Sequence, residues 1–138
     1  MAGSILLDTC AAIWIMKQMP LSISSRKVIQ KAYRGNSGVY VSPFSAWEVG
    51  MLVSKGRITL TIPPEEWFNS LIEMPGIRLA PLTPKILLAS SMLPGIPPGD
   101  PADRIIAATA RELGQTLITR DSKLLDYARE GHIRAQAC

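Results

Sequence analysis

The stretch DPADRIIAATARELGQTLITRD, residues 100–121, carries the pattern that decides the fold: a helix, a tight turn and a buried strand. Asp100 suits the N-cap of a helix over residues 101–113, and Gly114 suits the residue just past its end. The run TLITR at residues 116–120 is short and largely apolar, as expected of a strand buried on both faces. A helix that leads directly into a buried strand predicts an α/β fold with a parallel sheet.

Strand-like and helix-like stretches alternate in the same way along the whole chain. Strands are expected at residues 4–8, 39–42, 77–82, 116–120 and 132–136. Helices are expected at residues 11–18, 24–34, 43–55, 84–92, 101–113 and 122–129, with another in the stretch PPEEWFNSLIEMPG. We therefore expect a three-layer α/β/α domain with a central parallel sheet of about four to five strands. The length of 138 residues predicts that residues 1–138 form a single domain.

The composition is that of a globular chain, with 47% hydrophobic and 19% charged residues. No apolar run reaches the roughly 18 to 20 residues that a membrane span needs, so no membrane association is expected. Cys10 and Cys138 stand far apart in the sequence, which favours a reducing, cytoplasmic location. With His132 as the single histidine and no CxxC pair, a structural zinc site is not expected.

Four acids fall where this architecture places its functional edge. Asp8 ends the first strand, Glu48 lies in the first turns after the second, and Asp121 ends the strand that precedes the last helix. Asp103 lies in the first turn of its helix. Because the carboxyl ends of parallel strands meet at one edge of the sheet, the four acids should converge. An all-oxygen site of this kind suits Mg²⁺ or Mn²⁺, and such metals support phosphodiester hydrolysis.

Each of these acids also has a purely structural interpretation. Asp8 and Asp121 could be ordinary N-caps, and Glu48 could be the capping-box partner of Ser45. Asp103 could be an acid that favours the first turn of its helix without any ligand. It is less plausible that four acids with purely structural roles all converge on one edge of the sheet. We therefore predict that they are the catalytic and metal-binding residues.

Several neighbouring residues are expected to support the acids. Asp100 has a structural role as a helix N-cap, and Thr9 and Thr119 flank acids that their hydroxyl groups could orient. Arg104 could fix a carboxylate or meet a phosphate. The three tryptophans stand at helical apolar positions and are expected in the core, with Trp47 packing so as to hold the adjacent acid in place.

A basic helix face is the second feature that points to a polyanion. Lys27, Lys31 and Arg34 have i, i+4, i+7 spacing, so they share one face of the helix expected at residues 24–34. A one-sided basic helix suits a phosphate backbone, and these three residues are our candidates for binding a polynucleotide. The alternative is a solvated face that only keeps the protein soluble.

The stretches LLDTC, VSPFSAWEVGMLVSKGRITL, DPADRIIAATA and LITRD together resemble the PIN-domain family, and more narrowly its VapC-type toxins of type II toxin–antitoxin pairs. The resemblance places the family's metal-binding acids on the same four acids. It implies an endoribonuclease dependent on Mg²⁺ or Mn²⁺, commonly a homodimer, which a cognate antitoxin inhibits by inserting into the groove. Pro98 and Ala102 stand where many relatives carry a histidine and an aromatic residue, so details of the groove are expected to differ.

The sequence lacks the signatures of other protein families with this architecture. A receiver domain needs a further acidic pair near the first strand, and a haloacid-dehalogenase-like phosphatase needs Asp-x-Asp, whereas Thr9 and Cys10 follow Asp8. A dinucleotide-binding domain needs a glycine-rich turn after the first strand. The remaining alternative is a non-catalytic PIN-like module that binds nucleic acid or an antitoxin.

Overall fold

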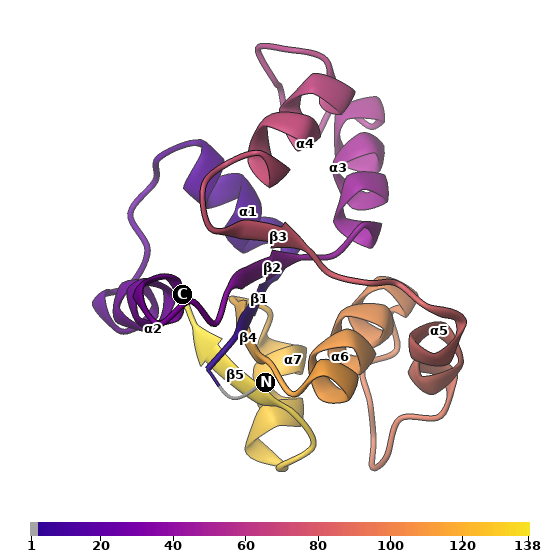
Figure 1. Ribbon diagram of the computed structural model, residues 1–138. Helices are drawn as coiled ribbons and strands as arrows, with labels where there is room; N and C mark the ends of the chain where they lie inside the picture. The colour runs from indigo at the N-terminus through magenta and orange to yellow at the C-terminus, as the bar shows by residue number, and fades with distance from the viewer. Residues whose placement is uncertain (1–2) are drawn as a thin grey trace.

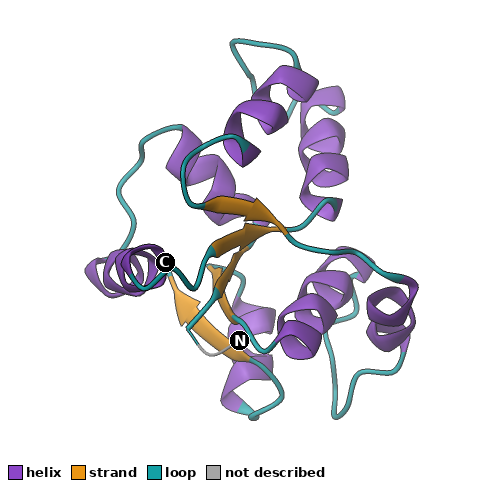
Figure 2. Cartoon of the chain, in the orientation of Figure 1, coloured by secondary structure: helices purple, strands orange, loops and turns teal. Residues whose placement is uncertain are grey.

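A computed structural model describes residues 3–138, which form a parallel five-stranded sheet with helices on both sides (Figures 1 and 2). The strand order is β3-β2-β1-β4-β5. The strands are β1 (Ile5–Leu7), β2 (Val39–Val41), β3 (Ile77–Leu79), β4 (Thr116–Thr119) and β5 (Arg134–Ala137). The helices are α1 (Thr9–Met16), α2 (Ile23–Arg34), α3 (Phe44–Ser54), α4 (Pro64–Ile72), α5 (Pro84–Ser91), α6 (Pro101–Leu113) and α7 (Ser122–Arg129).

The central strand β1 is buried along its whole length, which explains its unbroken apolar sequence. Ile5 and Leu7 belong to a core shared with α1, α2, α3 and α4, whereas Leu6 belongs to a second core shared with α6 and α7. Successive strand residues point to opposite faces, so one short strand contributes to two cores. The predicted three-layer α/β/α fold is therefore confirmed. Helix α5 packs outside α6 (Figure 1).

The register of the sheet fixes where its carboxyl edge lies. Leu7 of β1 pairs with Val41 of β2 and with Ile118 of β4, so these three strands end at the same level. The backbone N–H of Asp8 then donates to the carbonyl of Ile118 at 3.0 Å, which holds the end of β1 against β4. Side chains that follow the three strands consequently emerge side by side.

The helix ends follow the sequence signals closely. The Asp100 side chain accepts hydrogen bonds from the first turn of α6, and Gly114 takes the left-handed φ of +63° that ends this helix. The strands are shorter than predicted. Strand β1 ends early because Asp8 is already the N-cap of α1, which begins at Thr9 and not at residue 11. Strand β3 ends at Leu79 and not at residue 82, and irregular chain leads from it to α5. Strand β5 lies two residues later than expected at its start. None of the helices in residues 3–138 is long and apolar enough to cross a bilayer.

Candidate metal centre at the carboxyl edge of the sheet

Five carboxylates line one cavity of about 610 Å³ at the carboxyl edge of the sheet. They are Asp8, Glu48, Asp100, Asp103 and Asp121. These acids come from four parts of the chain: the end of β1, helix α3, the start of α6 and the turn that follows β4. The four acids predicted to converge therefore share one cavity, together with the N-cap acid of α6.

Asp8 is held by a hydroxyl from the neighbouring strand. The hydroxyl of Thr119 donates to Oδ2 of Asp8 at 2.5 Å, and the same oxygen of Thr119 accepts the backbone N–H of Asp121 at 3.0 Å. Although Asp8 stands at the N-cap position of α1, its carboxylate makes no capping hydrogen bond. The backbone N–H groups of Thr9 and Cys10 still lower the pKa of Asp8, so its carboxylate also faces the start of α1. Thr119 links Asp8 with Asp121.

Glu48 is held in a similar way by the first residue of α1. The hydroxyl of Thr9 lies 2.7 Å from Oε1 of Glu48, to which it donates, and 2.8 Å from the hydroxyl of Ser45. Ser45 lies inside the first turn of α3, and it is Ser42 whose hydroxyl accepts a backbone N–H at the helix start, that of Phe44 at 3.0 Å. The capping-box interpretation of Glu48 and Ser45 is therefore wrong, and Glu48 faces the cavity.

Asp121 and Asp100 are N-caps and cavity residues at once. Oδ1 of Asp121 accepts the backbone N–H groups of Lys123 and Leu124, and Oδ1 of Asp100 accepts those of Ala102 and Asp103. In each of these residues a single carboxylate oxygen, Oδ1, accepts both capping hydrogen bonds. Capping therefore fixes the direction in which these side chains point without removing them from the cavity.

The surroundings of three of the acids, Asp8, Glu48 and Asp103, raise their pKa values. Burial raises the pKa values of Asp8 and Glu48, an effect that the hydrogen bonds from Thr119 and Thr9 partly offset. The pKa of Asp103 is raised to about 7, first by burial and then by the negative charges of the other four acids. A bound cation would relieve both causes because it replaces lost hydration and cancels the repulsion.

The donors fit a hard divalent cation by their chemistry. The cavity offers carboxylate and hydroxyl oxygens and no imidazole, which is the set that Mg²⁺ and Mn²⁺ prefer. The thiol of Cys10 also lines the cavity, but burial and the nearby acids raise its pKa to about 11, so it stays protonated and is a poor metal ligand. Within residues 3–138, no three carboxylate, imidazole or thiol groups form a ready-made metal site. Mg²⁺ commonly keeps several waters and takes only one or two carboxylates directly, so the open arrangement agrees with such a cation.

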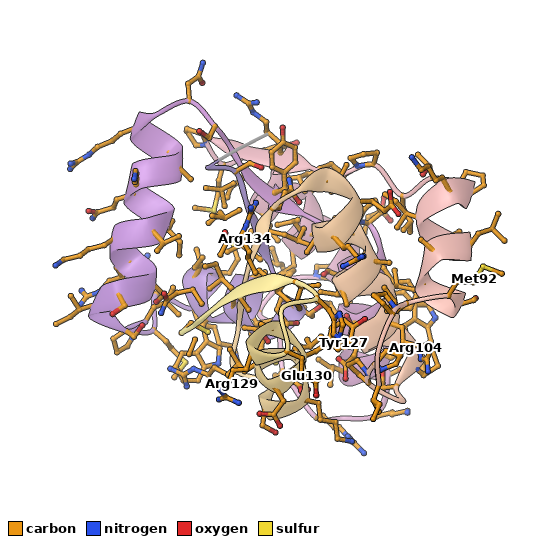
Figure 3. All side chains as sticks on the ribbon, turned by 90° about the horizontal axis from the view of Figure 1, so that it is seen from below. Met92, Arg104, Tyr127, Arg129, Glu130 and Arg134 are labelled. Atoms are coloured by element: carbon orange, nitrogen blue, oxygen red, sulfur yellow. The ribbon has the colours of Figure 1, made fainter. Side chains whose placement is uncertain are left out.

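Two sets of residues predicted for the site lie elsewhere. Arg104 does not line the acidic cavity, and Figure 3 shows it near Tyr127, whose phenol is within reach of its charge. Lys27, Lys31 and Arg34 do share one face of α2, as their spacing predicted, but they line a separate depression. The sequence showed that these cations were grouped, and only the structure shows which surface they occupy.

Other residues in the cavity were not predicted. Five of them carry aromatic rings or positive charges: Phe44, Trp47, Lys55, Arg57 and Arg120. Arg120 is held with its guanidinium carbon 3.4 Å from the centre of the Trp14 ring. Trp47 was expected in the core, yet 57% of it is exposed. Helical spacing from Glu48 could have indicated Phe44 and Lys55, because residues four and seven positions apart share a face, and Trp47 follows because it stands three positions after Phe44.

Comparisons with known proteins agree with this fold. The family model of the PIN domain matches residues 5–130. The chain is 35% identical over 125 residues to ribonuclease VapC22 of Mycobacterium tuberculosis (strain ATCC 25618 / H37Rv), covering 90% of this chain and 92% of that protein.

Two solved structures resemble the whole chain. A chain of VapBC2 from Rickettsia felis, bound to a DNA fragment from its promoter, has a TM-score of 0.70 at 16% identity, covering 97% of this chain and 98% of that one. A chain of DNA-bound VapBC from Salmonella typhimurium has a TM-score of 0.64 at 19% identity, covering 97% of both. At these identities the likeness concerns the fold alone.

The chain therefore belongs to the PIN domain family. Its similarity to ribonuclease VapC22 over nearly the full length of both proteins places it among the VapC-type members of that family. The family expected from the four sequence stretches is confirmed.

Proposed function

We propose that this protein is a divalent-metal-dependent endoribonuclease that acts as the toxin of a toxin–antitoxin pair. The observation that carries the proposal is the cavity at the carboxyl edge of the sheet, which five carboxylates line and where a bound cation would relieve the burial and repulsion that raise the pKa of Asp103. The similarity to ribonuclease VapC22 supports RNA as the substrate and phosphodiester hydrolysis as the reaction.

Four acids would hold the metal: Asp8, Glu48, Asp103 and Asp121. When bound, Mg²⁺ or Mn²⁺ supplies Lewis-acid chemistry for hydrolysis of a phosphodiester bond. Thr119 and Thr9 orient the carboxylates of Asp8 and Glu48, so these two acids need little reorganisation when a cation arrives. Asp100 fixes the start of α6, and with it the position of Asp103.

The direct test is cleavage of a mixed RNA pool by the purified protein. We expect cutting with Mg²⁺ or Mn²⁺, and none with EDTA or in the Asp8→Asn variant. A matched control is Asp126→Asn, which removes an exposed carboxylate of α7 outside the cavity and should leave cleavage intact. Cutting that persists in EDTA, or equally in Asp8→Asn, would contradict the proposed metal centre.

A second candidate is a non-catalytic PIN-like module that binds nucleic acid or an antitoxin. The observation in its favour is that the described residues contain no ready-made group of three metal ligands. The same assay separates the candidates. RNA retained on the folded protein without cleavage under any metal condition favours the binding module.

The proposed partner is a cognate antitoxin that covers the acidic cavity. Support comes from the solved structures of similar fold, which are VapBC assemblies bound to DNA. An antitoxin seated in the cavity should suppress cleavage at one equivalent per toxin chain. Unchanged cleavage in the purified complex would argue against that location.

We further propose that the protein forms a homodimer through the outer surface of α5. Leu87, Leu88, Met92 and Ile96 expose large apolar side chains on this helix and the loop that follows it. Figure 3 shows Met92 at the outer edge of the molecule. Contiguous exposed apolar residues are typical of protein interfaces, and a second copy would bury them.

A further inference from the structure

Helix α3 turns one whole face toward the acidic cavity. Phe44, Trp47, Glu48 and Lys55 all line the cavity, and so do Met51 and Leu52 between them. The spacing of three or four residues keeps them on one stripe of the helix. At a rise of about 1.5 Å per residue, Lys55 lies roughly 10 Å along the axis from Glu48, while Trp47 is adjacent to it. The stripe therefore presents aromatic, acidic and basic groups in order.

The aromatic end of the stripe is a preformed flat surface. The Phe44 and Trp47 rings are stacked, with centroids 5.2 Å apart and planes inclined by 25°. Trp47 is 57% exposed, whereas Trp67 of the core is only 6% exposed. Neither Phe44 nor Trp47 belongs to the two hydrophobic cores of the described residues. Phe44 thus backs an indole whose other surface is available to a ligand.

The basic end of the stripe is also available. Lys55 and Arg57 are both exposed at the end of α3 and in the turn that follows. Among residues 3–138, neither forms an ion pair with an acid. Their charges are therefore free to meet an anion at the rim of the cavity.

We propose that the Phe44–Trp47 pair is a stacking platform for an unpaired base of single-stranded RNA, with Lys55 and Arg57 holding a phosphate of a neighbouring nucleotide. This inference rests on the proposed function and specifies the form of its substrate. Aromatic stacking requires a base that is free of its own helix, so duplex RNA would not use the platform.

Charge distribution favours RNA over a protein partner as the occupant of this stripe. An aromatic surface followed by free cations is the combination that single-stranded nucleic acids bind. A basic peptide would suit the five carboxylates but would be repelled by Lys55 and Arg57 at the rim. An acidic peptide would suit the rim cations, but it carries no nucleobase to stack on the Phe44–Trp47 pair.

The test is binding of a short labelled single-stranded RNA of mixed sequence, and of its duplex, by fluorescence anisotropy in EDTA. Trp47→Ala should weaken single-strand affinity by about 5- to 100-fold, while Trp47→Phe keeps a ring and should stay within about threefold of the wild type. Duplex affinity should be the same in all three proteins. The variants are expected to fold because Trp47 lies outside both cores.

Intrinsic fluorescence provides a readout that a structural role would not change. A base stacked on Trp47 should quench part of the tryptophan emission, and Trp47→Phe should lose that quenching although it still binds. Trp67→Phe is the matched control: it removes an indole from the core and should keep the quenching.

Several outcomes would contradict the proposed stacking platform. Unchanged single-strand affinity in Trp47→Ala, or quenching retained in Trp47→Phe, would exclude base stacking at this position. Normal RNA binding together with weakened antitoxin binding in Trp47→Ala would assign the surface to the antitoxin instead. Failure of the wild type to cleave RNA would refute the proposed enzyme but not this inference, which depends on binding without metal.

Discussion

Replacing Asp103 by asparagine should stabilise the metal-free protein above neutral pH. The folded-state pKa of this carboxyl is about 7, against an ordinary value of 3.8, chiefly because it is buried and secondly because other acids surround it. A raised pKa means that the folded state holds the proton more tightly than the unfolded state. The wild type should therefore lose stability as pH rises from about 4 to about 7, and the loss should be complete above pH 7.

The size of the effect follows from that difference. Taken in full, the difference between the folded-state pKa and the ordinary pKa of Asp103 corresponds to about 4 kcal/mol of lost stability. Because the side chain is only half-buried and solvent screens its interactions, we expect a loss of about 2 kcal/mol. Asparagine also loses the favourable interaction of an acid with the first turn of α6, which costs about 0.5 kcal/mol. The net gain of about 1 to 2 kcal/mol should raise the melting temperature by roughly 3 to 8 °C.

Thermal melts of both proteins in EDTA at pH 5 and pH 8 measure this difference. The difference in melting temperature between the two proteins should be small at pH 5 and reach its full size at pH 8. Saturating Mn²⁺ should stabilise the wild type more than Asp103→Asn. Glu73→Gln, which removes an exposed carboxylate outside the cavity, should show no such gap. A variant less stable than the wild type at pH 8, or a gap independent of pH, would refute the idea of crowded carboxylates.

Three further predictions test the surroundings of the cavity. Thr119→Val removes the hydroxyl that holds Asp8, so calorimetric titration should show divalent-metal affinity lowered by about 10-fold or more; unchanged affinity would contradict this role. Leu88→Glu should convert a dimer to a monomer in light scattering, and an unchanged mass would exclude the α5 surface. Replacing Lys27 and Lys31 by alanine should lower the log–log salt slope of long-RNA binding by about 1 to 1.5 without changing cleavage of short RNA, and an unchanged slope would leave the face merely solvated.

Sequence pattern predicted the layers because the signals involved are local. An N-cap aspartate, a terminal glycine and an unbroken apolar run each act within a few residues, so helix α6 and strand β4 were placed nearly to the residue. The ends of parallel strands share one edge whatever the details of packing. This is why the acids after β1 and β4, together with Glu48 and Asp103, could be predicted to meet.

The errors arose where a side chain's direction depends on neighbours distant in sequence. Glu48 and Ser45 fit a capping box by spacing, but Thr9, 36 residues before Ser45, contacts both. Trp47 has the spacing of a core residue, yet the cavity leaves that face of α3 uncovered. Local spacing cannot distinguish a helix face that is covered from one that is not.

The sequence by itself therefore determined the order of elements and the parallel sheet, because these follow from local propensity and the period of the apolar pattern. It also predicted that the four acids meet at one edge, because the ends of parallel strands lie together. Tertiary structure decided which cations approach those acids. Lys27 and Lys31 are close to Asp8 in sequence but lie on another surface, whereas Arg57 and Arg120 come from separate loops and line the cavity. The physical reason is that the path of each loop over the sheet is set by packing on both of its faces, which no single segment encodes.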